Sequence, residues 1–258
     1  MTADRLLVED RDRVRVLTLN RPDKLNAFDD ELLGALGVAM AQTAADDSVH
    51  VTVLTGAGRA FSVGADLSAM AQSHDEAGDT PRPGKGLFDD LQATLESFPK
   101  PLVAAVNGLG IGFGFTLLGY CDFTLVARSA RLRTPFSQIG LSPEASSSYL
   151  FPLRMGWGAA ARALMLGDWF SAEDVVACGL AQKVVEDAAL MDAALTLADR
   201  LAQHSLQSLA ATKRLMLEAH LPAIRAARRL EGETMAGLIG TPANRAAVKA
   251  FAARKKGS

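Results

Sequence analysis

Four short apolar runs, rich in β-branched residues and each closed by turn residues, constrain the fold of this chain more than any other feature. Such runs predict β-strands, and they lie at residues 14–20, 50–55, 101–107 and 122–127. Patterns of helical periodicity lie between them, at residues 29–43, 66–71 and 87–98, and an apolar helix is expected to end at Tyr120. A unit of strand, loop and helix that recurs without a fixed period predicts a mixed α/β core rather than a repeat array.

A polar segment interrupts this pattern, and the C-terminal part of the chain is mainly helical. Residues 73–86 are polar and hold two prolines and three glycines, so we expect a loop there. Residues 171–179 predict a capped helix. Ser171 lies three positions before Asp174, as in a capping box, and Gly179 is typical of the residue that ends a helix. Beyond residue 187 the pattern is helical almost to the end, which predicts a core over residues 1–195 and a helical C-terminal region over residues 196–258.

Composition excludes several classes of protein. Hydrophobic residues make up 49% of the 258 positions, enough to bury a sizeable core, and the formal net charge of -2 argues against nucleic acid or an anionic membrane as partner. No apolar run is long enough to span a bilayer. The two cysteines, Cys121 and Cys178, lie far apart, so neither a disulfide framework nor a zinc site is expected. Two isolated cysteines fit a reducing compartment, and the sequence shows neither the apolar core of a signal peptide nor a peroxisomal C-terminal address. We therefore expect a cytoplasmic location.

Two glycine-rich turns follow predicted strands, and neither fits a common catalytic motif. The segments GAGRAFSVGADL (56–67) and NGLGIGFGFTLLG (107–119) both fail the G-x-G-x-x-G pattern of dinucleotide-binding proteins. AFSVG (60–64) resembles the nucleophile elbow of a serine hydrolase, but no later histidine has a motif around it. The adjacent His74, Asp75 and Glu76 fall in the polar loop and indicate a solvated face rather than a metal site.

Glycine turns at strand ends allow a ligand to approach the main chain closely. If a helix begins directly after the turn, its first N–H groups are unpaired, and two such turns can direct two N–H groups at one oxygen. The alternative is that the glycines only permit tight turns and close packing. From the residues alone, both interpretations stay open.

Together the segments GAGRAFSVGADL and AVNGLGIGFGFTLLGYCDF, with RPDKLNAFD near the start and FSAEDVVACGLAQKVV later, resemble the enoyl-CoA hydratase/isomerase (crotonase) superfamily. The resemblance covers nearly the whole chain in the expected order. It implies a spiral of ββα units, a helical C-terminal region that trimerises, and an acyl-CoA thioester as ligand.

The resemblance assigns roles by position. The N–H groups of Ala65 and Phe113 would form the oxyanion hole, with the bulky Phe113 ring turned away from the thioester. A basic residue of the tail, Arg254 or Lys255, would reach a phosphate of coenzyme A. Residues matching the stretches that hold coenzyme A are Lys24, Leu25, Ala27, Val63, Gly64, Ala65, Asp66, Leu67 and Phe113. For Asp66, capping of the helix expected at 66–71 is the simpler role.

Family hydratases use two glutamates, and the matching positions here hold Thr116 and Phe136. Addition of water needs one group to activate the water and another to protonate carbon, so this pair is missing. The stretch TPFSQIGLSPEASSSYLFP (134–152) instead resembles peroxisomal-type Δ3,Δ2-enoyl-CoA isomerases, which makes Glu144 the catalytic base. A structural alternative has Ser142 as N-cap and Pro143 as first residue of a helix, with Glu144 stabilised by the positive helix end.

The resemblance therefore predicts a Δ3,Δ2-enoyl-CoA isomerase that moves a proton from C2 to C4 through a dienolate. The alternatives are an enoyl-CoA hydratase of fatty-acid β-oxidation and a non-catalytic acyl-CoA-binding protein. No metal or redox cofactor is expected, and the predicted assembly is a homotrimer or a dimer of trimers.

Overall fold

A computed structural model describes residues 4–66 and 85–255, without the side chains of residues 85 and 251–255. Its larger sheet has six strands in the order β1-β2-β3-β5-β7-β10, with β1 and β2 antiparallel and the other pairs parallel. Residues in β3 and β5 are almost all buried, as expected for strands covered on both faces. The strands are β1 (Leu6–Arg11), β2 (Val14–Leu19), β3 (Val51–Gly56), β5 (Leu102–Val106), β7 (Phe123–Ala127) and β10 (Lys183–Val185).

A second sheet of four short strands lies beside it, in the order β4-β6-β8-β9. The chain alternates between the two sheets: β3, β5 and β7 each enter the large sheet, and β4, β6 and β8 then enter the small one. A helix follows each pair, so the fold is a spiral of ββα units as predicted. The small strands are β4 (Ala60–Ser62), β6 (Leu109–Ile111), β8 (Arg131–Arg133) and β9 (Phe170–Ser171).

Helices surround the sheets and form the C-terminal end. Those of the spiral are η1 (Pro22–Lys24), α1 (Asp30–Ala45), α3 (Lys85–Ser97), α4 (Phe113–Thr116), η2 (Leu117–Tyr120), η3 (Ser137–Ile139), α5 (Ser147–Ala161), η4 (Arg162–Leu166), α6 (Ala172–Ala177) and η5 (Asp187–Ala189). Those that follow are α7 (Leu190–Ala202), α8 (Leu206–Glu218), α9 (Leu221–Leu238) and α10 (Pro242–Lys255).

The four predicted strands are all present, with ends that differ by a residue or two. The helix predicted at 171–179 is also confirmed: Ser171 and Asp174 cap each other, and Gly179 adopts a φ of +87°. The helix predicted at 66–71 and most of the loop predicted at 73–86 lie outside the described residues. The short strands of the second sheet were not predicted, because two or three residues carry no readable periodicity.

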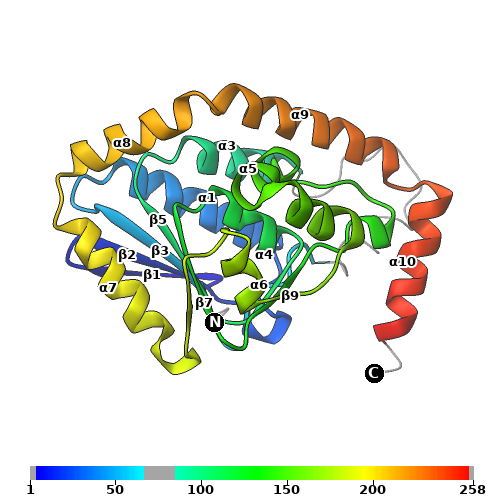
Figure 1. The fold of residues 1–258 in the computed structure, drawn as a ribbon, viewed down its shortest axis with the longest axis horizontal. Coiled ribbons are helices and arrows are strands. Elements are labelled where there is room, and N and C mark those ends of the chain that lie inside the picture. Colours follow the sequence, from blue (N-terminus) through cyan, green and yellow to red (C-terminus); the bar gives the residue numbers. More distant parts are fainter. Residues whose placement is uncertain (1–3, 67–84, 256–258) are drawn as a thin grey trace.

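The C-terminal helices close one side of the molecule (Figure 1). Helices α8 and α9 pass over α3 and α5, and α10 turns back along the edge. The predicted boundary between residues 195 and 196 falls within α7, which packs against β2, β3, β5 and β7 of the large sheet. Helix α8 is fixed to the same sheet by Lys213, whose Nζ lies 2.6 Å from Asp122 Oδ2 and donates to Lys100 O at 2.9 Å.

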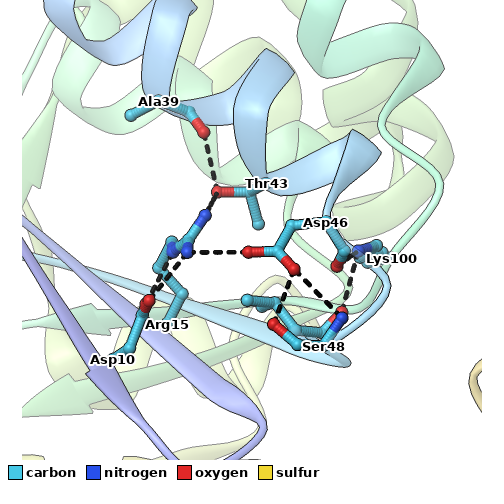
Figure 2. A network of polar contacts seen from close by, with 8 residues as sticks. Asp10, Arg15, Ala39, Thr43, Asp46, Ser48 and Lys100 are labelled. Carbon is cyan, nitrogen blue, oxygen red and sulfur yellow. Dashed lines mark hydrogen bonds and ion pairs between the residues drawn. The ribbon is translucent and has the colours of Figure 1, made fainter.

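A polar network secures the C-terminal end of α1 (Figure 2). Arg15 on β2 donates to Asp10 at 2.6 Å, to Asp46 at 3.0 Å and to Thr43 at 3.3 Å. Lys100, just before β5, donates to the carbonyls of Asp46 and Val49. These bonds hold α1 to the start of β2 and β5, and therefore stabilise the scaffold rather than a site.

Candidate active site

The loop that precedes α1 is fixed by one buried side chain, Asn26. Its Nδ2 donates to the carbonyls of Ala57 and Ala60, at 2.9 and 2.8 Å, and its Oδ1 accepts from the N–H of Arg21 at 2.8 Å. The backbones of Leu25 and Asn26 both have positive φ, 53° and 55°, an uncommon conformation for residues with a Cβ. The predicted coenzyme A stretch at residues 24–27 is thus a strained loop joined to the turn after β3.

The two amides predicted to form the oxyanion hole lie on adjoining segments. Gly64 has a φ of +76°, and a Cβ added to it would lie 2.7 Å from Ile111 O and 3.1 Å from Phe113 N. Ala65 forms an isolated parallel bridge with Phe28, in which Gly64 and Asp66 supply the hydrogen bonds. Within the described part of the chain, the N–H groups of Ala65 and Phe113 have no acceptor. Two unpaired amides are therefore close together where only glycine fits.

Phe113 presents its amide here while its ring belongs to the core. The side chain is buried, with edge-to-face contacts to Phe28 at 5.0 Å and Phe88 at 4.9 Å between ring centroids. The ring thus sits in an aromatic cluster of the interior.

Other glycines of the two turns serve close packing. A Cβ at Gly56, Gly108 or Gly114 would come within 2.4 Å of a backbone carbonyl of the neighbouring segment, which is closer than any carbon can approach. The packing interpretation therefore holds for these three glycines, and it does not compete with a role for the amides near Gly64.

Asp66 has an ionic partner that the sequence did not reveal. The Arg21 guanidinium is buried and lies 3.4 Å from Asp66 Oδ2 and 3.1 Å from Asp29 Oδ2, and it also donates to Ala27 O. Asp29 in turn caps α1 by accepting from Leu32 N–H at 2.9 Å. One arginine therefore ties together the two predicted coenzyme A stretches.

Glu144 lies on the approach to α5, but the helix does not begin where the sequence indicated. The prediction of Ser142 as N-cap and Pro143 as first helical residue is wrong: α5 begins at Ser147, and residues 141–144 have no regular structure. Ala145 and Ser146, between Glu144 and the helix, both have left-handed φ values of 62° and 53°. Two consecutive residues of this kind form a tight turn that separates Glu144 from the helix axis.

The N-terminus of α5 is capped by a distant residue, Glu231 on α9. Its Oε2 accepts from Ser146 N–H and its Oε1 from Ser148 N–H, both at 2.7 Å, while Ser147 N–H bonds to Glu144 O at 3.2 Å. The first N–H groups of the helix thus each have an acceptor other than the Glu144 carboxylate, which is partly buried. The Glu144 side chain is therefore not needed to cap α5, and the structural alternative does not explain why a glutamate stands at this position.

A buried polar cluster surrounds this cap. Tyr120 Oη donates to Ser146 Oγ at 3.1 Å, and Ser146 Oγ donates to Ile224 O at 3.1 Å. Glu96 on α3 forms an ion pair with Arg228 on α9, with 2.9 Å between Oε1 and Nε. Burial raises the pKa values of the Glu96 and Glu231 carboxyl groups above their ordinary range.

Tyr120 connects the cluster to the glycine turns. It ends the helical segment α4–η2 that begins with Phe113, and burial raises the pKa of its hydroxyl. Gly119, in the same segment, packs closely against Leu150 of α5. A Cβ added at Gly119 would lie only 3.2 Å from the Cβ of Leu150. Gly119 and Tyr120, at the end of this segment, therefore contact Leu150 and Ser146, which follow Glu144 in the chain.

The positions that match the hydratase glutamates are both buried. Thr116 is fully buried and its Oγ1 donates to Gly112 O at 3.3 Å, and Phe136 is 5% exposed. Of the remaining predicted residues, Leu67 lies outside the described chain. Arg254 and Lys255 fall at the end of α10, and their side chains are not described.

Comparison with known proteins gives the same picture as the fold. A profile of the enoyl-CoA hydratase/isomerase family matches residues 9–258. The chain belongs to this family. It shares 38% identity over 73% of its length with the 1,2-epoxyphenylacetyl-CoA isomerase of Escherichia coli (72% of that protein), and 33% over 95% with the 2,3-dehydroadipyl-CoA hydratase of the same organism (94% of that protein).

Relatives named as isomerases and as hydratases thus occur at similar identity. The enoyl-CoA delta isomerase 2 of Rattus norvegicus is 37% identical over 69% of this chain and 46% of its own length. The crystal structure of an enoyl-CoA hydratase/isomerase from Pseudoalteromonas atlantica superposes with a TM-score of 0.89, at 32% identity and 97% coverage of both chains. The protein is an enzyme of the enoyl-CoA hydratase/isomerase family with the crotonase fold.

Sequence reasoning missed Glu231 and its partners. The signal was present in α9, where Ile224, Arg228, Glu231 and Met235 recur at helical spacing, so that a carboxylate occupies a position of the apolar face. A buried carboxylate needs donors, and the search for them leads to Ser146 and Ser148.

Proposed function

We propose that this enzyme is a Δ3,Δ2-enoyl-CoA isomerase with Glu144 as its base. The observation that carries the proposal is the distribution of carboxylates. Thr116 and Phe136 occupy the positions that resemble the hydratase glutamates, whereas Glu144 stands on the turn packed against the α4–η2 segment. One carboxyl group is enough for an isomerase, because the proton that it takes is the proton that it returns.

The reaction balances without a cofactor. Glu144 removes a proton from C2 of a 3-enoyl-CoA, and the C2–H electron pair forms the C1=C2 bond of a dienolate while the C1=O π pair moves onto the thioester oxygen as negative charge. The C3=C4 bond stays in place in this step, and the C2=C3 bond forms only when C4 takes up the proton. The protonated Glu144 then delivers the proton to C4, the charge returns from oxygen, and the 2-enoyl-CoA is left with its double bond conjugated to the thioester. Our expectation that no metal or redox group is needed follows from this balance.

The amides of Ala65 and Phe113 would hold the thioester oxygen. They are unpaired within the described chain and adjoin at Gly64. Loss of one such donor typically raises the barrier by about 2.7–4 kcal/mol. The coenzyme A moiety would lie along residues 24–27 and 63–66, which Arg21 ties together, with Arg254 or Lys255 near a phosphate.

A homotrimer or dimer of trimers is the assembly we propose. Large apolar side chains lie exposed on the single chain, and Trp157 and Met165 are 74% and 67% exposed. Surfaces of this kind mark contacts between proteins. Among the described residues, no helix has the length and apolarity to span a membrane. A cytoplasmic location stays part of the proposal.

Hydration is the main alternative, since several relatives are named hydratases. The purified enzyme should be given 3-hexenoyl-CoA and 2-hexenoyl-CoA separately while absorbance of the conjugated thioester is followed. We expect absorbance to appear with the first and to persist with the second. Loss of conjugation from 2-hexenoyl-CoA would identify a hydratase, and binding without turnover of either would identify a non-catalytic acyl-CoA-binding protein.

A further inference from the structure

Glu231 is a buried carboxylate, and no cationic side chain among the residues that the structure describes pairs with it. It is 7% exposed, and both of its oxygens accept backbone N–H groups, from Ser146 and Ser148, at 2.7 Å each. Burial of a charge is costly unless hydrogen bonds replace water. Here two charge-assisted bonds at the positive end of α5 offset part of that cost.

The segment that Glu231 holds is strained. Ala145 and Ser146 lie in the left-handed region, with φ values of 62° and 53°, which is unfavourable for residues that carry a Cβ. Such a conformation persists only where surrounding contacts impose it. For Ser146 these contacts are the Glu231 carboxylate, the Tyr120 hydroxyl and the carbonyl of Ile224, so α9 supplies two of the three.

The strained turn leads directly to the candidate base. The carbonyl of Glu144 accepts both Ser147 N–H at 3.2 Å and Ser147 Oγ–H at 2.6 Å. The Glu144 backbone is thus joined to the first residue of α5, between the two amides that Glu231 binds. A shift of these amides would move Glu144 with them.

We infer that Glu231 is a positioning residue that holds Glu144 in place through the turn at residues 145–148. The inference rests on the proposed function, because it treats Glu144 as the base. Glu231 itself does not touch the substrate. It acts from helix α9, which lies across α3 and α5 on the outside of the spiral (Figure 1).

The test compares Glu231→Gln with the wild type. Glutamine keeps the size of the side chain but places an NH2 group against one of the two N–H donors. A displacement of about 1 Å can cost 10²-fold in rate. We therefore expect kcat for 3-hexenoyl-CoA to fall by about 10- to 100-fold, while KM changes less than about threefold because the predicted coenzyme A stretches lie elsewhere.

Glu233→Gln is the matched control. Glu233 stands two residues further along α9, 61% exposed, where it pairs with Arg229 on the surface. The same chemical change there should leave kcat and KM as in the wild type. Glu231→Asp keeps both carboxylate oxygens on a shorter side chain, and we expect it to recover part of the lost kcat.

Hydrogen exchange reports on the turn without a substrate. In Glu231→Gln, amides in the peptide 139–152 should exchange at least about tenfold faster, with the amides of β5 unchanged. A kcat that stays at the wild-type value would overturn the inference, as would faster exchange in β5 to the same extent, since that indicates general destabilisation. If the wild type itself turns over neither hexenoyl-CoA, the proposed function fails and the positioning role fails with it. An active wild type and an equally active variant refute the positioning role alone.

Discussion

Asn26 shows how much of the site depends on single buried amides. It is fully buried, bonds three backbone groups and adopts a φ of 55°. Each group left without a partner inside a protein costs about 1–3 kcal/mol. We expect Asn26→Ala to lower the free energy of unfolding by about 2–4 kcal/mol in urea titrations.

Asn20→Ala is the control for this change. Asn20 precedes the same loop but makes one exposed bond, to Asp4 O at 2.8 Å, so the expected effect is within about 0.5 kcal/mol. Equal effects of the two substitutions would show that the network around Asn26 adds no stability.

Glu231 also predicts a pH dependence of stability. Burial raises the folded-state pKa of this carboxyl above its ordinary value of 4.5, so the folded chain binds the proton more tightly than the unfolded chain. The stabilisation that the folded chain gains from this tighter proton binding is fully present below pH 4.5. It is lost as the pH rises from 4.5 through the raised pKa. The unfolding free energy of the wild type should therefore fall relative to that of Glu231→Gln as the pH rises through this window.

Urea titrations of both proteins at several pH values measure this difference. The other titrating groups near the cap, Tyr120 and Glu96, are common to both proteins, so their titration largely cancels. A difference that is flat over the window would contradict the raised pKa.

At the scale of elements, the proposed oxyanion hole requires the turn after β4 to touch the turn before α4. A Cβ at Gly64 would clash with Ile111 O and crowd Phe113 N. We expect Gly64→Ala to lower kcat by about 10²–10³-fold, the range observed when one oxyanion donor is lost. Steady-state rates on 3-hexenoyl-CoA check this.

Gly37→Ala provides the comparison within α1. No atom lies within 4 Å of an added Cβ there, so alanine should raise the unfolding free energy by about 0.5–1 kcal/mol and leave kcat unchanged. If Gly64→Ala keeps a kcat within threefold of wild type, the two amides do not act as proposed.

The same elements show how far the sequence predicts structure. Long periodic runs such as β3 and α1 were placed within two residues, because burial imposes their pattern. The start of α5 was misplaced by several residues. Local capping rules favoured Ser142 and Pro143, whereas the actual cap comes from Glu231, 85 positions after Ser146, and no local rule contains such a contact.

For the whole molecule, the C-terminal helices contact the loop that carries Glu144 and also form part of the surface. Helix α9 holds the turn at Ser146, and Asn244 of α10 donates to Ile139 O at 2.7 Å. The loop that carries Glu144 is therefore held from both ends by the C-terminal region. The same region leaves apolar side chains such as Leu215 and Leu230 exposed on the single chain.

Assembly into a homo-oligomer would cover such side chains. Light scattering should give a particle of three or six times the 27.2 kDa chain mass at micromolar protein concentration. A stable particle of 27.2 kDa would contradict the proposed assembly.

The central claim is that one carboxyl group, Glu144, carries the proton between C2 and C4. The most direct measurement is the rate at which Glu144→Gln converts 3-hexenoyl-CoA to the conjugated isomer, beside the wild type and Glu233→Gln. We expect the Glu144 variant to lose about 10²–10⁴-fold in kcat, the usual contribution of a general base, with coenzyme A thioester binding retained. A kcat within about tenfold of the wild type would contradict the claim.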